Sequence, residues 1–364
     1  MKYKKIIISL LIILFLFMLV ICGHTKKIEF QIDNELTTSL KKNLEKNHGV
    51  DLRYFENNII YGSIYDHSIN TTILETRSIF TYDIKSKQFI NYNYDMNNRI
   101  MDFKFLNDSI FYIQVEEKDK KFYWKFIMSN KSFSNKKTLK YGIVENPFSH
   151  PRILHDNNTI VLVSINDIDD EIQEYSIDLI TPNNDIINIK NEKGYKNKKI
   201  GNLLYNISNV SLSNKKVLYT EVDENKVQYL SEINVDTKEN KVLLKNDKNM
   251  FIIYNFKKMK KGLYIQLALK EEENKSYFIY IKDNEIKKKI KGDLKTFDNV
   301  FKDYLIFHNK GNKFEIFSEE KLSFKHYNID IVDIFPYYMI INDRILIQDF
   351  SNNFYFSESL EKYI

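Results

Sequence analysis

The densest group of carboxylates in the chain is Asp167, Asp169, Asp170 and Glu171, which follow one another within five residues. Oxygen ligands of this kind suit Ca²⁺, so these four residues are a candidate metal site. The segment lacks the central glycine and the distal glutamate of an EF-hand loop. The same composition is ordinary for a solvated hairpin tip, and the sequence favours the tip while leaving calcium open.

Other residues that could do chemistry are scattered. The seven histidines form no metal-binding pair: His150 and His155 are five residues apart with Pro151 between them, and no glutamate completes a zinc motif. The chain has nine glycines and one cysteine, with no Gly-x-Ser-x-Gly elbow and no phosphate-binding loop. The sequence therefore names no catalytic residue and predicts no cofactor other than the calcium considered above.

The one cysteine lies in an N-terminal segment that predicts export. Lys2, Lys4 and Lys5 precede an apolar run over residues 6–23, a pattern typical of a signal peptide or a membrane anchor. Cys22, with Leu19 three positions before it, resembles the lipobox of bacterial lipoproteins, which implies lipidation of Cys22. Ile21 departs from the small residue of that pattern, so an uncleaved anchor and a released chain stay open.

Residues 1–27 are thus predicted to be a signal peptide or anchor with a short tether, and residues 28–364 to be the folded domain. The positive-inside rule places that domain on the outer face of a bacterial cytoplasmic membrane. The formal net charge of +5 equals the charge of the five lysines in residues 1–27, which include no acid. Because the folded domain is neutral overall, the sequence predicts no nucleic-acid partner.

Short aliphatic and aromatic runs recur through this domain at intervals of 40 to 57 residues. That interval is close to the length of one four-stranded propeller blade. Each run has a second alternating strand after it, such as Tyr229–Glu232, and Asn or Asp commonly stands in the turn before it. The seven runs are Ile59–Tyr61, Ile110–Tyr112, Ile160–Leu162, Val217–Tyr219, Leu263–Ile265, Leu305–Phe307 and Ile345–Ile347.

The sequence therefore predicts an all-β, seven-bladed β-propeller whose strands run A to D from the inside outward. The seventh repeat lacks its outer strand, and the alternating segment Ile28–Ile32 is expected to supply it and close the ring. Leu36, Leu40 and Leu44, after a possible cap at Asp33 or Asn34, predict a short helix. Two β-sandwich domains, or six blades with an insertion at residues 190–201, remain the alternatives.

The segment Ser211–Tyr219, a polar turn leading into an aliphatic strand that ends in tyrosine, resembles the TolB-like branch of β-propellers. The resemblance extends loosely over residues 50–360. The Pro-Asp-Gly turn common in that branch is absent, as are Trp-Asp endings and paired glycines. The resemblance implies the fold alone, because propellers of this kind differ widely in function.

Charge is unevenly distributed between the expected turns. The seven A–B turns carry twice as many bases as acids, whereas the seven B–C loops carry twice as many acids as bases. We expect the turn face to lie toward an anionic membrane and the loop face to point outward. Ordinary solvated turns give the same counts. The expected membrane-facing bases are Lys215, Lys216, Lys257, Lys258, Lys260 and Lys261.

Together these features favour a membrane-tethered, extracytoplasmic module. It would bind a protein, peptide or envelope polymer through the loop face without catalysis. A propeller enzyme, either a lyase or a glycosidase acting on extracellular or cell-wall polysaccharide, is the alternative, because carboxylates from separate blades can meet at the centre of such a fold.

Overall fold

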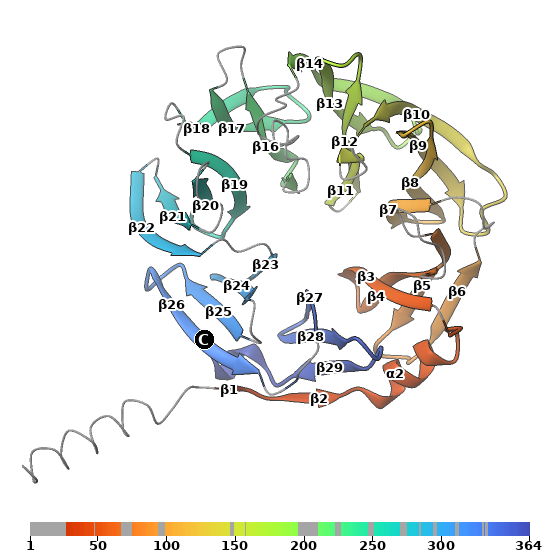
Figure 1. The fold of residues 1–364 in the computed structure, drawn as a ribbon, viewed down its shortest axis with the longest axis vertical. Helices are drawn as coiled ribbons and strands as arrows, with labels where there is room; N and C mark the ends of the chain where they lie inside the picture. The colour runs from red at the N-terminus through yellow and green to blue at the C-terminus, as the bar shows by residue number, and fades with distance from the viewer. Residues whose placement is uncertain are drawn as a thin grey trace, which may run out of the picture. The chain divides into compact units, whose positions relative to one another are not determined.

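The structure is a computed structural model, and its strands form seven separate sheets of a β-propeller (Figure 1). The chain divides into two compact units, which are considered separately below. The residues that the structure describes are 27–46, 48–66, 75–93, 99–145, 149–156, 158–195, 210–222, 227–246, 251–269, 275–283, 285–293, 297–309, 313–329, 331 and 334–364.

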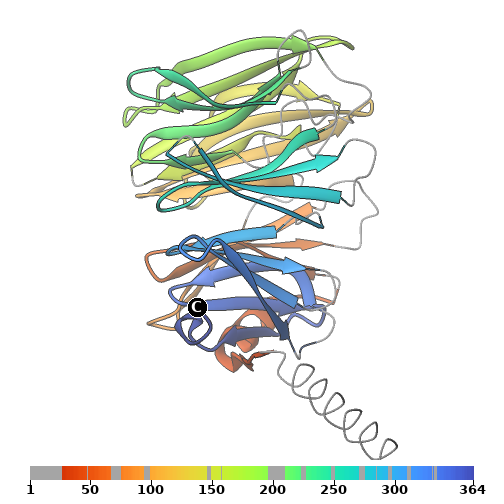
Figure 2. The ribbon, with the colours of Figure 1, turned by 90° about the vertical axis from the view of Figure 1, so that its left-hand side faces the viewer.

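The unit Thr38–Leu294 contains blades 1 to 5, each an antiparallel sheet in which chain order is spatial order. Figure 2 shows the twist of these sheets from the side. Blade 1 is β3 (His48–Glu56), β4 (Ile59–Asp66), β5 (Glu75–Asp83) and β6 (Phe89–Asn93). Blade 2 is β7 (Arg99–Leu106), β8 (Ser109–Lys118), β9 (Lys121–Asn130) and β10 (Lys137–Val144). Blade 3 is β11 (Arg152–Asp156), β12 (Thr159–Asp167), β13 (Ile172–Ile180) and β14 (Ile186–Tyr195). Blade 4 is β15 (Ser211–Ser213), β16 (Lys216–Val222), β17 (Gln228–Asn234) and β18 (Asn240–Asn246). Blade 5 is β19 (Phe251–Lys258), β20 (Leu263–Leu269), β21 (Lys275–Lys282) and β22 (Glu285–Asp293).

The other unit joins the N-terminal residues up to Thr37 with Lys295–Ile364 and contains blades 6 and 7. Blade 6 is β23 (Phe297–Phe301), β24 (Tyr304–Asn309), β25 (Lys313–Ser318) and β26 (Ser323–Ile329). Blade 7 is β27 (Ile334–Ile341), β28 (Arg344–Asp349) and β29 (Phe354–Ser357), completed by β2 (Phe30–Ile32). The prediction of seven blades closed by an N-terminal strand is therefore confirmed.

The closing segment differs from the prediction in one detail. It forms two strands instead of one: β1 (Lys27–Ile28) pairs in parallel with β26, and β2 then pairs antiparallel with β29. The N-terminal segment thus links blade 6 to blade 7. The helix α2 (Asn34–Lys41) follows, with Asp33 Oδ1 accepting a hydrogen bond from the Leu36 N–H at 2.8 Å as its cap. Leu36 and Leu40 of α2 are fully buried.

Asparagine stands in several tight turns, as expected from its tolerance of the left-handed backbone conformation. Asn57, Asn107, Asn214 and Asn342, all in A–B turns, have φ between 49° and 55°. The A–B and C–D turns of a blade lie at the same end of the sheet. In blade 4 the Val235 N–H donates to the Lys215 carbonyl at 2.9 Å. This end of each blade is called the turn end below.

At two backbone bulges in the inner strands, side chains of the preceding blade form hydrogen bonds with the backbone. In β7 the register shifts between Ile100 and Asp102, and the Thr76 hydroxyl of blade 1 bonds both the N–H and the carbonyl of Ile100. In β19 the same shift follows Ile253, whose N–H and carbonyl are bonded by the Gln228 side chain of blade 4. Because these groups are buried, the hydrogen bonds of Thr76 and Gln228 hold each blade in a fixed position against the next.

Several sequence-based expectations lie outside the described residues. The apolar run over residues 6–23 and Cys22 are among them, so lipidation and anchoring stay predictions. Among the residues that the structure describes, no helix is long and apolar enough to cross a membrane.

Candidate functional site

Charged and aromatic side chains from blades 1, 2 and 3 meet at their inner strands. The Nδ1 atom of His155 on β11 lies 3.7 Å from Oε2 of Glu56 on β3, although β7 belongs to the blade between them. Side chains of blades 1 and 3 can come this close only at the innermost strands of the sheets. We call the group the inner-strand cluster; it consists of Arg53, Tyr54 and Glu56 on β3, Asp102 and Lys104 on β7, and Arg152 and His155 on β11.

Two side chains of the cluster are fixed by neighbouring backbone. Asp102 Oδ1 accepts from the N–H of Phe103, and Asp102 Oδ2 accepts from the N–H of Ile153 in blade 3, both at 2.9 Å. The Tyr54 hydroxyl accepts from the N–H of Phe105 in blade 2 at 2.9 Å. Burial raises the pKa of Tyr54. These bonds join three blades and hold the cluster in one arrangement.

Lys104 is the member whose charge is most affected by its surroundings. Its ammonium lies 3.6 Å from the centroid of the Tyr54 ring, a cation–π contact. Burial lowers the pKa of Lys104; Arg53 and Arg152 lower it further, and Asp102 and Glu56 act in the opposite direction. A lysine with a lowered pKa among converging charges is the feature by which functional sites are recognised, although structural ion pairs also produce it.

The cluster retains unused hydrogen-bonding capacity. Among the described residues, Arg53 Nε and His155 Nε2 are buried and have no hydrogen-bond partner. The other end of the Arg53 guanidinium pairs with Asp51, at 2.9 Å between Nη2 and Oδ2. Buried polar atoms normally form hydrogen bonds. Both nitrogens can therefore form a hydrogen bond with water or with a ligand. Chemically, the arrangement suits the binding of a polar group.

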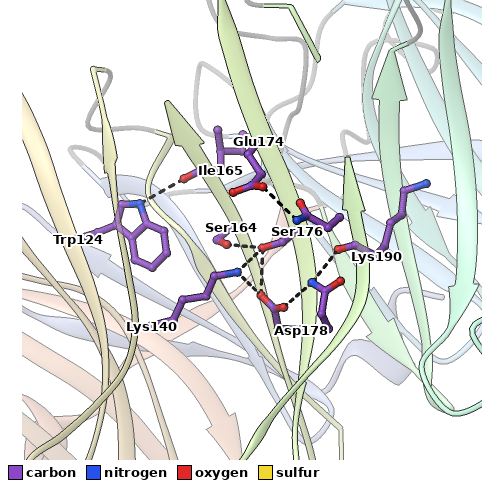
Figure 3. A network of polar contacts seen from close by, with 10 residues as sticks. Trp124, Lys140, Ser164, Ile165, Glu174, Ser176, Asp178 and Lys190 are labelled. Atoms are coloured by element: carbon purple, nitrogen blue, oxygen red, sulfur yellow. Dashed lines mark hydrogen bonds and ion pairs between the residues drawn. The ribbon is translucent and has the colours of Figure 1, made fainter. Parts of the chain in front are cut away.

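A second polar network joins blades 2 and 3 (Figure 3). Lys140 on β10 donates to Ser176 Oγ at 2.7 Å and to Asp178 Oδ2 at 2.6 Å. Ser176 also lies 2.8 Å from Ser164, oxygen to oxygen. A Ser–Lys pair can form a nucleophile and base, but here the ammonium is paired with a carboxylate and both serines are buried. The network therefore fastens the blades and provides no nucleophile.

The predicted calcium ligands lie at the tip of the β12–β13 hairpin, and the protein itself occupies several of their oxygens. Asp169 Oδ1 accepts from the N–H groups of Glu171 and Ile172, at 2.8 and 2.7 Å. Asp167 accepts from the Gln173 side chain and from the N–H of Glu145. Over the described part of the chain, no group of three His, Cys, Asp or Glu residues is placed to hold a metal ion. Calcium binding by Asp167, Asp169, Asp170 and Glu171 stays a prediction.

The six predicted membrane-facing lysines lie at the turn ends of blades 4 and 5, and some have acidic partners there. Lys215 Nζ lies 2.7 Å from Asp236, and Lys216 Nζ lies 2.9 Å from Glu232. Lys258 is 4.0 Å from the same glutamate. Lys257, Lys260 and Lys261 also lie in or beside the β19–β20 turn. Their contact with a membrane stays a prediction.

Sequence reasoning did not find the inner-strand cluster. One signal was available: charged residues alternate with apolar ones in the inner strands, as in Asp102 and Lys104. Alternation predicts a strand but not which strand residues from other blades lie beside it. The approach of Glu56 to His155 joins residues that are 99 positions apart, so it follows from the fold and not from local spacing.

Comparison with solved structures supports the fold. An oligogalacturonate lyase in complex with manganese superposes with a TM-score of 0.58 at 9% identity, covering 92% of this chain and 97% of that chain. A chain of the mitotic checkpoint complex gives a TM-score of 0.50 at 8% identity, covering 92% of each chain. At such low identity these likenesses show the fold alone. No protein-family model and no curated protein matches the chain.

Proposed function

We propose that this protein is a membrane-tethered, extracytoplasmic β-propeller that binds a protein, peptide or envelope polymer without catalysis. The basic and apolar N-terminal segment supports the tether, and the propeller fold supports the binding role, since such folds serve as binding platforms as well as enzymes. The resemblance to TolB-like propellers agrees with this proposal at the level of the fold.

The inner-strand cluster is the observation that carries the proposal. Glu56 and His155 lie at the ends of β3 and β11 that lead into the A–B turns, so this site differs from the loop face expected from the sequence. It unites side chains of three blades around two nitrogens, Arg53 Nε and His155 Nε2, that have no partner in the described structure. The cluster contains three cations, and Asp51, Glu56 and Asp102 balance them. A balanced set of donors and acceptors suits a neutral or zwitterionic polar group better than a multiply charged one. The propeller enzyme remains the alternative function.

Binding can be tested on the full chain in lipid nanodiscs by isothermal titration calorimetry. The probes would be an N-acetylglucosamine hexamer, a galacturonate hexamer and an uncharged polar hexapeptide. We expect one of the two uncharged probes to bind more tightly than the galacturonate hexamer. Arg53→Ala or His155→Ala should weaken that binding by about tenfold or more, as expected when a buried hydrogen bond to a ligand is lost. Lys125→Ala, at an exposed position on β9, is the control and should leave binding unchanged.

Two results would count against the proposal. Equal binding by Arg53→Ala, His155→Ala and the wild type would remove the inner-strand cluster from the binding site. Cleavage of a probe, seen by mass spectrometry after incubation, would favour the enzyme. Each variant must first show the wild-type fluorescence of Trp124, the one tryptophan of the chain.

A further inference from the structure

The outer strands of the blades differ in how their free edges are protected. Those of blades 2 to 5 each contain one extra residue relative to the neighbouring strand, namely Leu139, Ile189, Leu243 and Lys287. Such β-bulges disturb the ladder, and each of these strands also carries at least two lysines. Bulges and lysines are the devices by which exposed edges resist pairing with another chain. β10, β14, β18 and β22 are therefore protected edges.

The outer strand of blade 6 has a regular edge, and this chain covers it. β26 pairs with β25 without any shift of register from Ser323 to Asn328. β1 adds to its outer side in parallel, with Lys27 opposite Asn328 and Ile28 opposite Ile329. Ile28 is 1% exposed. A regular outer edge of this propeller thus accepts an added strand.

β6, the outer strand of blade 1, is equally regular but is the last strand of its sheet in the described structure (Figure 1). Its register runs without a shift from Phe89 opposite Tyr82 to Asn93 opposite Ser78. Its sequence, Phe-Ile-Asn-Tyr-Asn, contains no charged residue, and Ile90 is 39% exposed. The outer strand of blade 7, β2, is also regular but has only three residues, and very short edges resist pairing. β6 therefore lacks the protection that the other outer strands have.

We propose that β6 is a docking edge, and that its partner is β6 of a second copy of this chain. Antiparallel pairing centred on Asn91 would place Ile90 of one copy opposite Tyr92 of the other. A β-branched residue opposite an aromatic one is a favourable cross-strand pair. No like charges meet in this pairing, whereas two copies of β22 would bring together strands with four lysines each. Charge thus favours β6 over the lysine-bearing edges for self-pairing.

The small area of a β6–β6 contact limits the strength of the association. A pair of five-residue strands buries far less than the roughly 1,600 Å² of a standard stable interface, so the association is weak in dilute solution. Tethering two copies to one membrane would raise their effective concentration and favour pairing. Covalent trapping in the membrane is therefore a better measurement than size-exclusion chromatography.

The test is cross-linking of the full chain in membranes with a short bis-maleimide. Cys22 is kept, so that any lipid anchor on it is retained in both variants, and Asn91→Cys places an additional thiol at the centre of β6. Val242→Cys places one on β18, where the side chain is 51% exposed and the edge is bulged, and it serves as the matched control. We expect several-fold more cross-linked dimer from Asn91→Cys than from Val242→Cys. Adding Ile90→Lys should reduce the dimer to the level of the control.

Three results would overturn the proposal. Equal dimer yields from Asn91→Cys and Val242→Cys would show only random collision or association through the N-terminal segment. A persistent dimer with Ile90→Lys would separate dimerisation from the β6 edge. Cross-linking of Asn91→Cys to a different protein would mean that another extended segment occupies β6. Urea unfolding followed by Trp124 fluorescence checks that Ile90→Lys, at an exposed position, leaves the fold intact.

Discussion

Blade 7 and the junction of blades 2 and 3 are held together by different chemistry. Blade 7 is closed by backbone hydrogen bonds: the Asp33 N–H donates to the Phe354 carbonyl at 2.8 Å, and the Leu360 N–H donates to the Asp343 carbonyl at 2.6 Å. Leu360 is fully buried beneath them. At the blade 2–blade 3 junction, the fastening is an ion pair between the partly exposed Lys140 and the buried Asp178, with serine and asparagine partners (Figure 3).

The difference indicates where the fold needs a contact that specifies how two blades align. An ion pair whose carboxylate is buried adds little net stability compared with apolar packing, because the carboxylate loses its hydration. The ion pair forms only when Lys140 and Asp178 lie opposite each other. It can therefore fix how two blades of similar sequence align. Blade 7 needs no such device, since its two pairing segments, β2 and β29, come from opposite ends of the chain and differ in sequence. That the ion pair specifies blade register is our hypothesis, and substitutions can test it.

The largest effect is expected from removing one member of the ion pair. Lys140→Ala leaves the Asp178 carboxylate, whose side chain is 2% exposed, buried without its cation. Such breakage costs about 3–5 kcal/mol of the free energy of unfolding. Urea denaturation followed by Trp124 fluorescence measures it, and Lys125→Ala is the control. A loss comparable with the control would mean that water already solvates Asp178.

A somewhat smaller effect is expected in the closing region. Leu360→Ala removes a fully buried side chain from the 3-10 helix at Leu360–Lys362. Large-to-small substitutions of this kind cost about 2–4 kcal/mol. Hydrogen exchange should speed up in Phe354–Ser357 and in Phe30–Ile32, which pair with each other. Unchanged exchange in both strands would show that Leu360 does not hold the closure.

Replacing the whole ion pair should cost much less than breaking it. With Lys140→Met and Asp178→Leu together, no buried charge remains, so the free energy of unfolding should stay within about 1 kcal/mol of the wild type. If the pair specifies register, this variant should nevertheless show a broader denaturation transition or faster hydrogen exchange in β10 and β14. A loss as large as that of Lys140→Ala would assign the network a stabilising role and contradict the hypothesis.

The sequence predicted the strands well because their signals are local. Alternating runs such as Val217–Tyr219 lie within β16, and turn asparagines such as Asn57 adopt the positive φ that was expected. The predicted helix is real but ends at Lys41, so Leu44 lies beyond it. What could not be predicted depends on the placement of whole blades. The split of the closing segment into β1 and β2 and the inner-strand cluster both follow from contacts between distant segments.

The smallest effect expected is a pH dependence in blade 7. Burial raises the pKa of Asp349, but bonds from Asn353, Tyr355 and the Ser351 N–H outweigh it, so the net pKa lies below the usual value. A carboxyl whose pKa is lower in the folded state stabilises the fold above its unfolded pKa, about 3.9, and loses this contribution as the pH falls through the folded value.

Between about pH 5 and pH 3, the wild type should therefore lose more stability than Asp349→Asn, which cannot titrate at this position. Hydrogen exchange in Phe354–Ser357 at the two pH values, corrected for the intrinsic exchange rates, is the measurement. If the wild type and Asp349→Asn respond equally, other groups account for any acid sensitivity there. The closing region would then depend on backbone bonds and apolar burial alone, and its contrast with the ion pair of blades 2 and 3 would be sharper.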